Sequence, residues 1–155
     1  MKYEVSIDIV ADTQLVWEVL TDLERWPEWT QSVTRLEWLS SPTLALGSRA
    51  RIKQPRLKKT VWTVTALEPP TGFSWEARQR GLTTIGSHRL DQRAPGRTTV
   101  TLAIEQHGAL APIVWFLSSR MMRRYLDFER GGLKARSEAL AADAHQPKMV
   151  LAAGQ

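Results

Sequence analysis

Hydrophobic and polar residues alternate along the first nine positions of the chain. The apolar set is Tyr3, Val5, Ile7 and Ile9, and the polar set is Lys2, Glu4, Ser6 and Asp8. A period of two places each set on its own face of an extended chain, so this segment is predicted to be a β-strand with one buried face.

Helical spacing follows Asp12, a residue type that favours helix N-termini. The apolar positions that share one face of this predicted helix are Leu15, Val16, Val19 and Leu20. We expect a second short helical segment, starting at Leu23, to stop near Arg25 or Trp26, because Pro27 cannot lie inside a helix.

Between Ser32 and Gly108, short runs rich in threonine, valine and tryptophan are separated by turns that contain proline or glycine. The predicted strands are Val33–Leu39, Ser48–Gln54, Lys59–Leu67, Phe73–Arg80, Leu82–Gln92 and Arg97–His107. Such short connections require antiparallel neighbours, because a parallel crossover needs about a dozen residues or more.

The segment from Leu110 to Leu140 repeats apolar residues at spacings of three and four, which predicts one long helix. One apolar ridge is Val114, Leu117, Met121, Tyr125 and Phe128, and a second is Trp115, Met122, Leu126, Leu133 and Leu140. The charged face is Arg120, Arg123, Asp127, Arg130, Lys134 and Glu138. An apolar arc this broad favours a helix enclosed by a curved sheet.

The predicted elements form a single unit. We assign residues 1–142 to one α+β domain and expect 143–155 to form a disordered tail.

Composition narrows the class of protein. The chain has 155 residues, enough for one hydrophobic core, and no cysteine, which excludes disulfides, thiolate catalysis and Cys-containing metal sites. Its N-terminus lacks a secretory core, and its longest apolar run, Ala109–Leu117, is about half the length of a bilayer span. We therefore expect a cytoplasmic protein without a transmembrane segment.

Tryptophan is unusually frequent, with seven residues against three Phe and two Tyr. So many indoles require a large core, a lined cavity, or both. The chain also has 21 basic and 16 acidic residues, a formal net charge of +5. A basic excess is compatible with solvated faces, an anionic membrane surface or nucleic acid.

Several segments together resemble one protein superfamily. They are Val16–Asp22 (VWEVLTD), Trp26–Trp29 (WPEW), Gly86–Leu90 (GSHRL) and the start of the long helix, Leu110–Tyr125. With the order of predicted elements, they resemble the START-like or Bet v 1-like helix-grip superfamily (SRPBCC), which includes the polyketide cyclase/dehydrase and lipid transport family. The resemblance spans about Tyr3 to Leu140.

This resemblance implies a helix-grip fold. A seven-stranded, curved antiparallel sheet would wrap around the long C-terminal helix, with two short helices after the first strand and a cavity between sheet and helix. Members bind lipids, sterols, polyketides or other apolar molecules, and a minority catalyse cyclisation, dehydration or hydrolysis. The fold alone assigns no reaction.

Aromatic residues are the first candidates for a ligand site. Trp26 and Trp29 flank Pro27, where they are expected to plug one end of the core. Trp62 and Trp75 lie on predicted neighbouring strands, either as cavity walls or as plain core. The candidate ligand-binding residues are Trp29, Trp62, Trp75, His88, Leu102, Leu117, Met121 and Tyr125.

His88 is the most informative titratable residue. If the turn centres on Pro95, Leu90 pairs with Val100, and His88 lies beside Leu102 on the apolar face. An inward imidazole is either a satisfied core residue, a ligand contact or an acid–base catalyst. Tyr125, on the long helix, is the second acid–base candidate.

The sequence lacks the motifs of metal binding, nucleophilic catalysis and paired-carboxylate catalysis. The three histidines show no metal-ligand spacing, and we expect no metal and no cofactor. No nucleophile elbow is present, and Ser87 points to the strand face opposite His88. The acids Asp8, Glu37, Glu76 and Asp91 are scattered.

Two groups of basic residues remain. Arg49, Arg51 and Lys53 alternate along one strand before Arg56, Lys58 and Lys59, and a second group on the long helix is Arg120, Arg123, Arg124 and Arg130. No aromatic residue interleaves the first group, which argues against nucleic acid as a partner. Solvated faces or contact with an anionic membrane remain alternatives.

Phe116 lies among the charged residues of the predicted long helix. It suggests a dimer contact, a membrane-touching edge or an isolated surface residue. We therefore expect either a monomer or a homodimer.

These observations favour binding or carriage of a small hydrophobic molecule over catalysis, because no recognisable catalytic constellation is present. The alternative is a cyclase or dehydratase that uses His88 or Tyr125 as acid or base, since enolisation needs only positioning and one such group.

Overall fold

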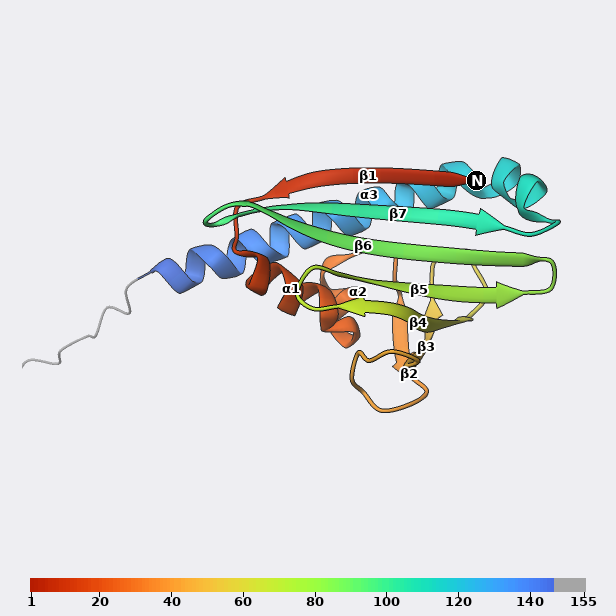
Figure 1. The fold of residues 1–155 in the computed structure, drawn as a ribbon, viewed down its shortest axis with the longest axis horizontal. Helices are drawn as coiled ribbons and strands as arrows, with labels where there is room; N and C mark the ends of the chain where they lie inside the picture. Colours follow the sequence, from red (N-terminus) through yellow and green to blue (C-terminus); the bar gives the residue numbers. More distant parts are fainter. Residues whose placement is uncertain (147–155) are drawn as a thin grey trace, which may run out of the picture.

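The computed structural model of the chain describes residues 1–146, which form one curved antiparallel sheet and one long helix (Figure 1). The strands are β1 (Lys2–Ile9), β2 (Arg35–Trp38), β3 (Arg49–Lys53), β4 (Thr60–Glu68), β5 (Gly72–Gln79), β6 (Leu82–Ala94) and β7 (Arg97–His107). Their spatial order is β1-β7-β6-β5-β4-β3-β2. The helix α3 (Ala111–His145) crosses one face of this sheet. The predicted helix-grip architecture is confirmed.

The register of the β6–β7 hairpin matches the sequence-based expectation. His88 pairs with Leu102 and Leu90 pairs with Val100, and all four side chains are buried. Because side chains alternate along a strand, this register turns His88 toward α3, while Ser87 lies on the opposite face. There Ser87 accepts a 3.1 Å hydrogen bond from the Ser74 hydroxyl.

The short helices differ in detail from the prediction. After α1 (Thr13–Thr21), a 3-10 turn η1 (Leu23–Arg25) starts at Leu23 and ends at Arg25 as predicted, but helical structure resumes directly in α2 (Trp26–Trp29), where Pro27 lies in the first turn. A proline is tolerated there because the first N–H groups of a helix have no intrahelical partner. Asp12 does precede α1, but its carboxylate accepts a hydrogen bond from Gly96 N instead of capping the helix.

The buried face of α3 corrects the expected helix phase. The ridge of Trp115, Met122, Leu126, Leu133 and Leu140 packs into or against the core. Of the other ridge, Tyr125 is buried but Leu117 is 76% exposed. Apolar residues cover more than half of the helix circumference, so their spacing alone could not show which ridge faces the sheet.

The C-terminal end of α3 lies later than expected, at His145 rather than near Leu140. Residues at 143–145, which the sequence placed in the tail, are therefore helical. The rest of that predicted tail, from position 147, lies outside the described residues.

Candidate functional site

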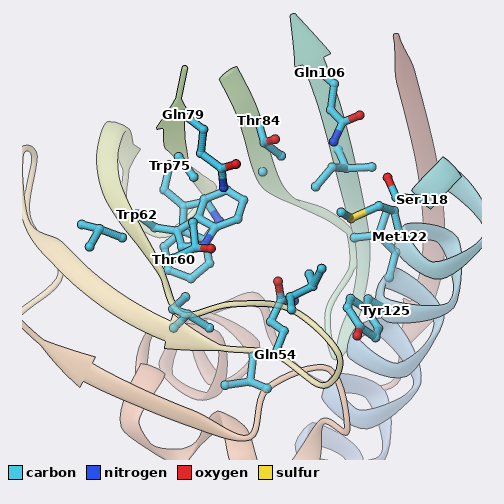
Figure 2. Close-up of a pocket in the computed structure, with 18 of the residues that line it drawn as sticks. Gln54, Thr60, Trp62, Trp75, Gln79, Thr84, Gln106, Ser118, Met122 and Tyr125 are labelled. Carbon is cyan, nitrogen blue, oxygen red and sulfur yellow. The ribbon is translucent and has the colours of Figure 1, made fainter. Parts of the chain in front are cut away.

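A cavity of about 630 Å³ separates the N-terminal half of α3 from the inner face of the sheet. It is lined by α3, by strands β4 to β7 and by the connection between β3 and β4 (Figure 2). Its volume lies within the usual range for small-molecule sites, about 300–1,000 Å³.

One wall of the cavity is aromatic. Trp62 on β4 and Trp75 on β5 have ring centroids 5.3 Å apart, and both side chains are buried. Beneath them lies Gly86 on β6, where a Cβ atom would come within 2.6 Å of the Trp75 Nε1 atom. The missing side chain of Gly86 therefore lets the Trp75 indole lie against the sheet and leaves the space above it open.

Several polar side chains are interspersed among the apolar ones that line the rest of the cavity. Figure 2 labels Gln54, Thr60, Gln79, Thr84, Gln106 and Ser118 around it, together with Met122 and Tyr125. Gln106 is 1% exposed, and its Oε1 atom accepts no hydrogen bond from the described residues. A buried carbonyl oxygen without a donor is unfavourable, so a polar group entering the cavity would relieve it.

Tyr125 joins α3 to the β3–β4 connection. Its hydroxyl donates a hydrogen bond to the backbone carbonyl of Pro55. Burial raises the pKa of the Tyr125 phenol, and the positive charges of Arg56 and Arg124 oppose that rise. The phenol therefore stays protonated at neutral pH and keeps this donor role.

A buried pair of side chains, His88 and Glu129, lies at the inner end of the cavity. His88 Nε2 is 2.8 Å from Glu129 Oε1, and the two residues are 6% and 8% exposed. The imidazole stacks on Phe73 with centroids 4.2 Å apart and meets the edge of Trp26 at 5.7 Å. Its second nitrogen, Nδ1, is buried without a hydrogen-bond partner in the described chain. Glu129 thus fixes the ring orientation through one nitrogen and leaves the other uncommitted.

The residues singled out by sequence divide into two groups. Trp62, Trp75, His88 and Tyr125 line the cavity. Trp29, Leu102, Leu117 and Met121 do not. Trp29 packs on Trp26 with centroids 5.5 Å apart, and Leu102 is fully buried in the core. Leu117 points to the surface, and the neighbouring Met122 lines the cavity in place of Met121, because α3 presents the other ridge to the sheet.

Glu129 is a site residue that the sequence analysis did not identify, and Gln106 is another. Glu129 follows Leu126 by three residues and precedes Leu133 by four, so it stands within the ridge that faces the core. A single carboxylate inside an apolar ridge is the signal that could have revealed it, because a buried glutamate requires a partner.

The described part of the chain contains neither a metal-ligating cluster nor a membrane-spanning helix. Residues 1–146 contain no cluster of three or more metal-ligating side chains. Within the same range, no helix has the length and apolar character needed to cross a bilayer.

Solved structures with the same fold carry diverse descriptions. The Zhui aromatase/cyclase from Streptomyces sp. R1128 is similar with a TM-score of 0.79 at 16% identity, over 95% of this chain and 99% of that chain. Norcoclaurine synthase from Thalictrum flavum, in a point mutant, gives a TM-score of 0.73 at 8% identity, over 91% and 96% of the two chains. A START superfamily protein from Mycobacterium smegmatis gives 0.70 at 14% identity, over 90% and 98%. Identities this low establish the shared fold alone.

Sequence comparison gives the family. No curated protein matches the chain. The family model described as polyketide cyclase/dehydrase and lipid transport matches residues 1–138, which include every strand and most of α3. The chain therefore belongs to the polyketide cyclase/dehydrase and lipid transport family.

Proposed function

We propose that this protein binds a small hydrophobic molecule in the cavity between the sheet and α3. The observation that carries the proposal is the cavity of about 630 Å³ with an indole wall. This space stays open although the chain contains seven tryptophans, whose side chains are large enough to fill it. Apolar lining with a few polar groups is typical of small-molecule sites.

The energetics allow useful affinity. A ligand that buries ~300 Å² of apolar surface gains about 7 kcal/mol at ~25 cal/mol per Å², before the entropic costs of association. A few hydrogen bonds then suffice for micromolar binding, which corresponds to about 8 kcal/mol.

The polar lining indicates what such a ligand carries. Within residues 1–146, Gln106 Oε1 has no donor, while Thr84 and Ser118 present hydroxyl groups to the same cavity. A mostly apolar molecule with a hydroxyl or N–H group directed at β7 fits this arrangement, because it would satisfy the buried carbonyl oxygen.

Native mass spectrometry of gently purified protein, combined with titration of the fluorescent probe 1-anilinonaphthalene-8-sulfonate, tests the proposal. We expect Ser118→Phe to lower probe affinity by about tenfold or more, because its ring fills the cavity. Ser118→Ala is the matched control and should bind normally. Wild-type protein that never carries a ligand and never binds the probe would contradict the proposal.

A second candidate function rests on the His88–Glu129 pair. A cyclase or dehydratase needs a base that removes a proton from carbon next to a carbonyl and an acid that protonates the departing hydroxyl. A buried imidazole oriented by a carboxylate is suited to both steps, and one solved structure with this fold is described as an aromatase/cyclase. Tyr125 is the less suitable acid–base group, because its proton is committed to the Pro55 carbonyl.

Turnover of a poly-β-ketone thioester separates the two functions. Catalysis predicts that His88→Ala abolishes product formation while probe affinity stays nearly unchanged, and that Glu129→Gln lowers turnover less. If wild-type protein forms no product and His88→Ala lowers probe affinity, His88 acts in binding and the second candidate is wrong.

A further inference from the structure

Large apolar side chains are exposed together where α3 begins. Leu110, Ile113, Phe116 and Leu117, here called the α3 patch, are 45%, 61%, 85% and 76% exposed. Other exposed apolar residues of similar size in the described chain, such as Val10 and Leu46, are far apart in sequence. A cluster of this kind indicates an interaction surface, whereas single exposed apolar residues need no explanation.

Arginines continue the same face of the helix. Ile113, Phe116 and Leu117 follow the spacing i, i+3, i+4, and Arg120 and Arg124 extend it by one and two further turns. No carboxylate lies within 4.0 Å of Arg120, Arg123 or Arg124 in the described chain, whereas Arg130, farther along α3, pairs with Asp127 at 2.8 Å.

The two arginines with defined contacts rest on aromatic rings. The Arg123 guanidinium lies 4.8 Å from the centroid of the Tyr3 ring, and that of Arg124 lies 5.2 Å from Phe128. Neither of these contacts is with a carboxylate.

We propose that the α3 patch and these arginines contact the surface of an anionic phospholipid bilayer. Apolar side chains at one end of a helix can enter the boundary between headgroups and acyl chains, while adjacent arginines pair with lipid phosphates. A second copy of the chain fits this surface less well, because the patch offers no carboxylate to pair with a partner's arginines.

The patch adjoins the cavity. Val114 and Ser118, on the inner side of the same helical turns, line the cavity. Leu110 N donates a 3.0 Å hydrogen bond to Gly81 O in the β5–β6 turn, which holds the patch at the rim. A bilayer docked there lies beside the opening, so an apolar ligand passes between membrane and cavity with little exposure to water. This last step rests on the proposed ligand-binding function, whereas the bilayer contact does not.

Sedimentation with sucrose-loaded vesicles tests the contact in the full chain. We expect binding to phosphatidylcholine vesicles with about 30% phosphatidylserine at about 100 mM salt, and weak binding to pure phosphatidylcholine. Phe116→Ser should lower the partition coefficient about tenfold through lost apolar insertion. Arg120→Gln should lower it about fivefold, the effect expected for one basic residue near an anionic surface.

Matched controls lie away from the patch. Leu46→Ser removes an apolar residue that is 70% exposed in the β2–β3 connection, and Arg97→Gln removes a charge at the β6–β7 turn. Both should bind vesicles as wild type does. Equal vesicle binding by Phe116→Ser and wild type would overturn the proposal. It would also be overturned if the wild-type protein does not bind vesicles but forms a dimer that the Phe116→Ser substitution dissociates.

Experiments can contradict the ligand-binding proposal and the membrane proposal separately. Phe116→Ser should bind the anilinonaphthalene probe normally, because Phe116 points away from the cavity. Vesicle binding without any cavity ligand would leave the membrane proposal intact and contradict the proposed function, and the reverse result would overturn the membrane proposal alone.

Discussion

The two halves of the space between the sheet and α3 are built from the same elements but filled differently. Beside the C-terminal half of α3, Leu20 and Leu133 are almost completely buried, and neither lines the cavity. At its N-terminal half, Val114, Ser118 and Met122 are only partly buried and line open space. The difference arises because α1 and α2 lie beside the C-terminal half and not beside the first turns of α3 (Figure 1).

This contrast indicates that the packed core and the cavity occupy different ends of one helix. The filled end is packed with buried apolar side chains, whereas the hollow end forgoes such contacts and leaves a cavity. His88 and Glu129 stand where the two ends meet. Four sets of variants test how strict this division is.

The largest expected effect is at the boundary itself. Glu129→Leu should lower the free energy of unfolding by about 3–4 kcal/mol, because it leaves the buried His88 Nε2 without its partner. Urea denaturation measures the loss. The double variant His88→Leu/Glu129→Leu should recover most of it, since both polar groups are then gone. If the double variant recovers no free energy of unfolding, the pair contributes through its shape rather than through its hydrogen bond.

The same substitution at two serines of α3 compares the two ends directly. Ser137 is completely buried at the filled end, so Ser137→Phe should cost about 3 kcal/mol through overpacking. Ser118→Phe, at the hollow end, should change the free energy of unfolding by less than about 1 kcal/mol. Thermal and urea unfolding give both values. Similar losses at the two positions would mean that the cavity does not accept a side chain.

Adjacent glycines in α3 provide a smaller contrast. A Cβ atom at Gly132 would lie 1.9 Å from the Trp29 carbonyl oxygen, whereas one at Gly131 would meet nothing within 4 Å. Gly132→Ala should therefore push α2 away and cost about 2 kcal/mol. Gly131→Ala should stabilise the protein by about 0.5–1 kcal/mol, the usual gain of alanine over glycine in a helix. Equal effects on the melting temperature would contradict this close packing of α3 on α2.

The smallest effect concerns the cavity wall. Gly86→Ala should move the Trp75 indole into the cavity and lower probe affinity by about tenfold, or 1.4 kcal/mol, with little change in fold. Fluorescence titration measures the affinity, and a near-ultraviolet circular dichroism spectrum reports the indole movement. Gly96→Ala, at the β6–β7 turn, is the control for binding because it lies away from the cavity.

The sequence predicted the sheet better than the helix. The Pro95–Gly96 turn and strict alternation set the β6–β7 register, because a one-residue shift would expose Leu90 and Val100. On α3 no comparable constraint acts, since two ridges are apolar enough to face the core. Trp62 and Trp75 were identified because their strands alternate, whereas Leu117 and Met121 followed from the wrong ridge.

The His88–Glu129 pair shows what single-sequence reasoning cannot supply. The two residues are 41 positions apart, and their contact depends on the phase of α3 against β6. The inward direction of His88 followed from alternation, but its partner required knowing which helix face meets the strand. Gln106 escaped attention for a related reason, because a glutamine near the end of a strand carries no signal of burial.

Four indoles form a continuous series through the protein, with successive centroid distances of 5.3 Å from Trp62 to Trp75, 5.4 Å from Trp75 to Trp26 and 5.5 Å from Trp26 to Trp29. At such separations, electronic excitation migrates between rings before emission. The intrinsic fluorescence of the protein therefore reports on the whole series. A quencher that contacts only Trp62 reduces the emission that is excited at Trp26 and Trp29 as well.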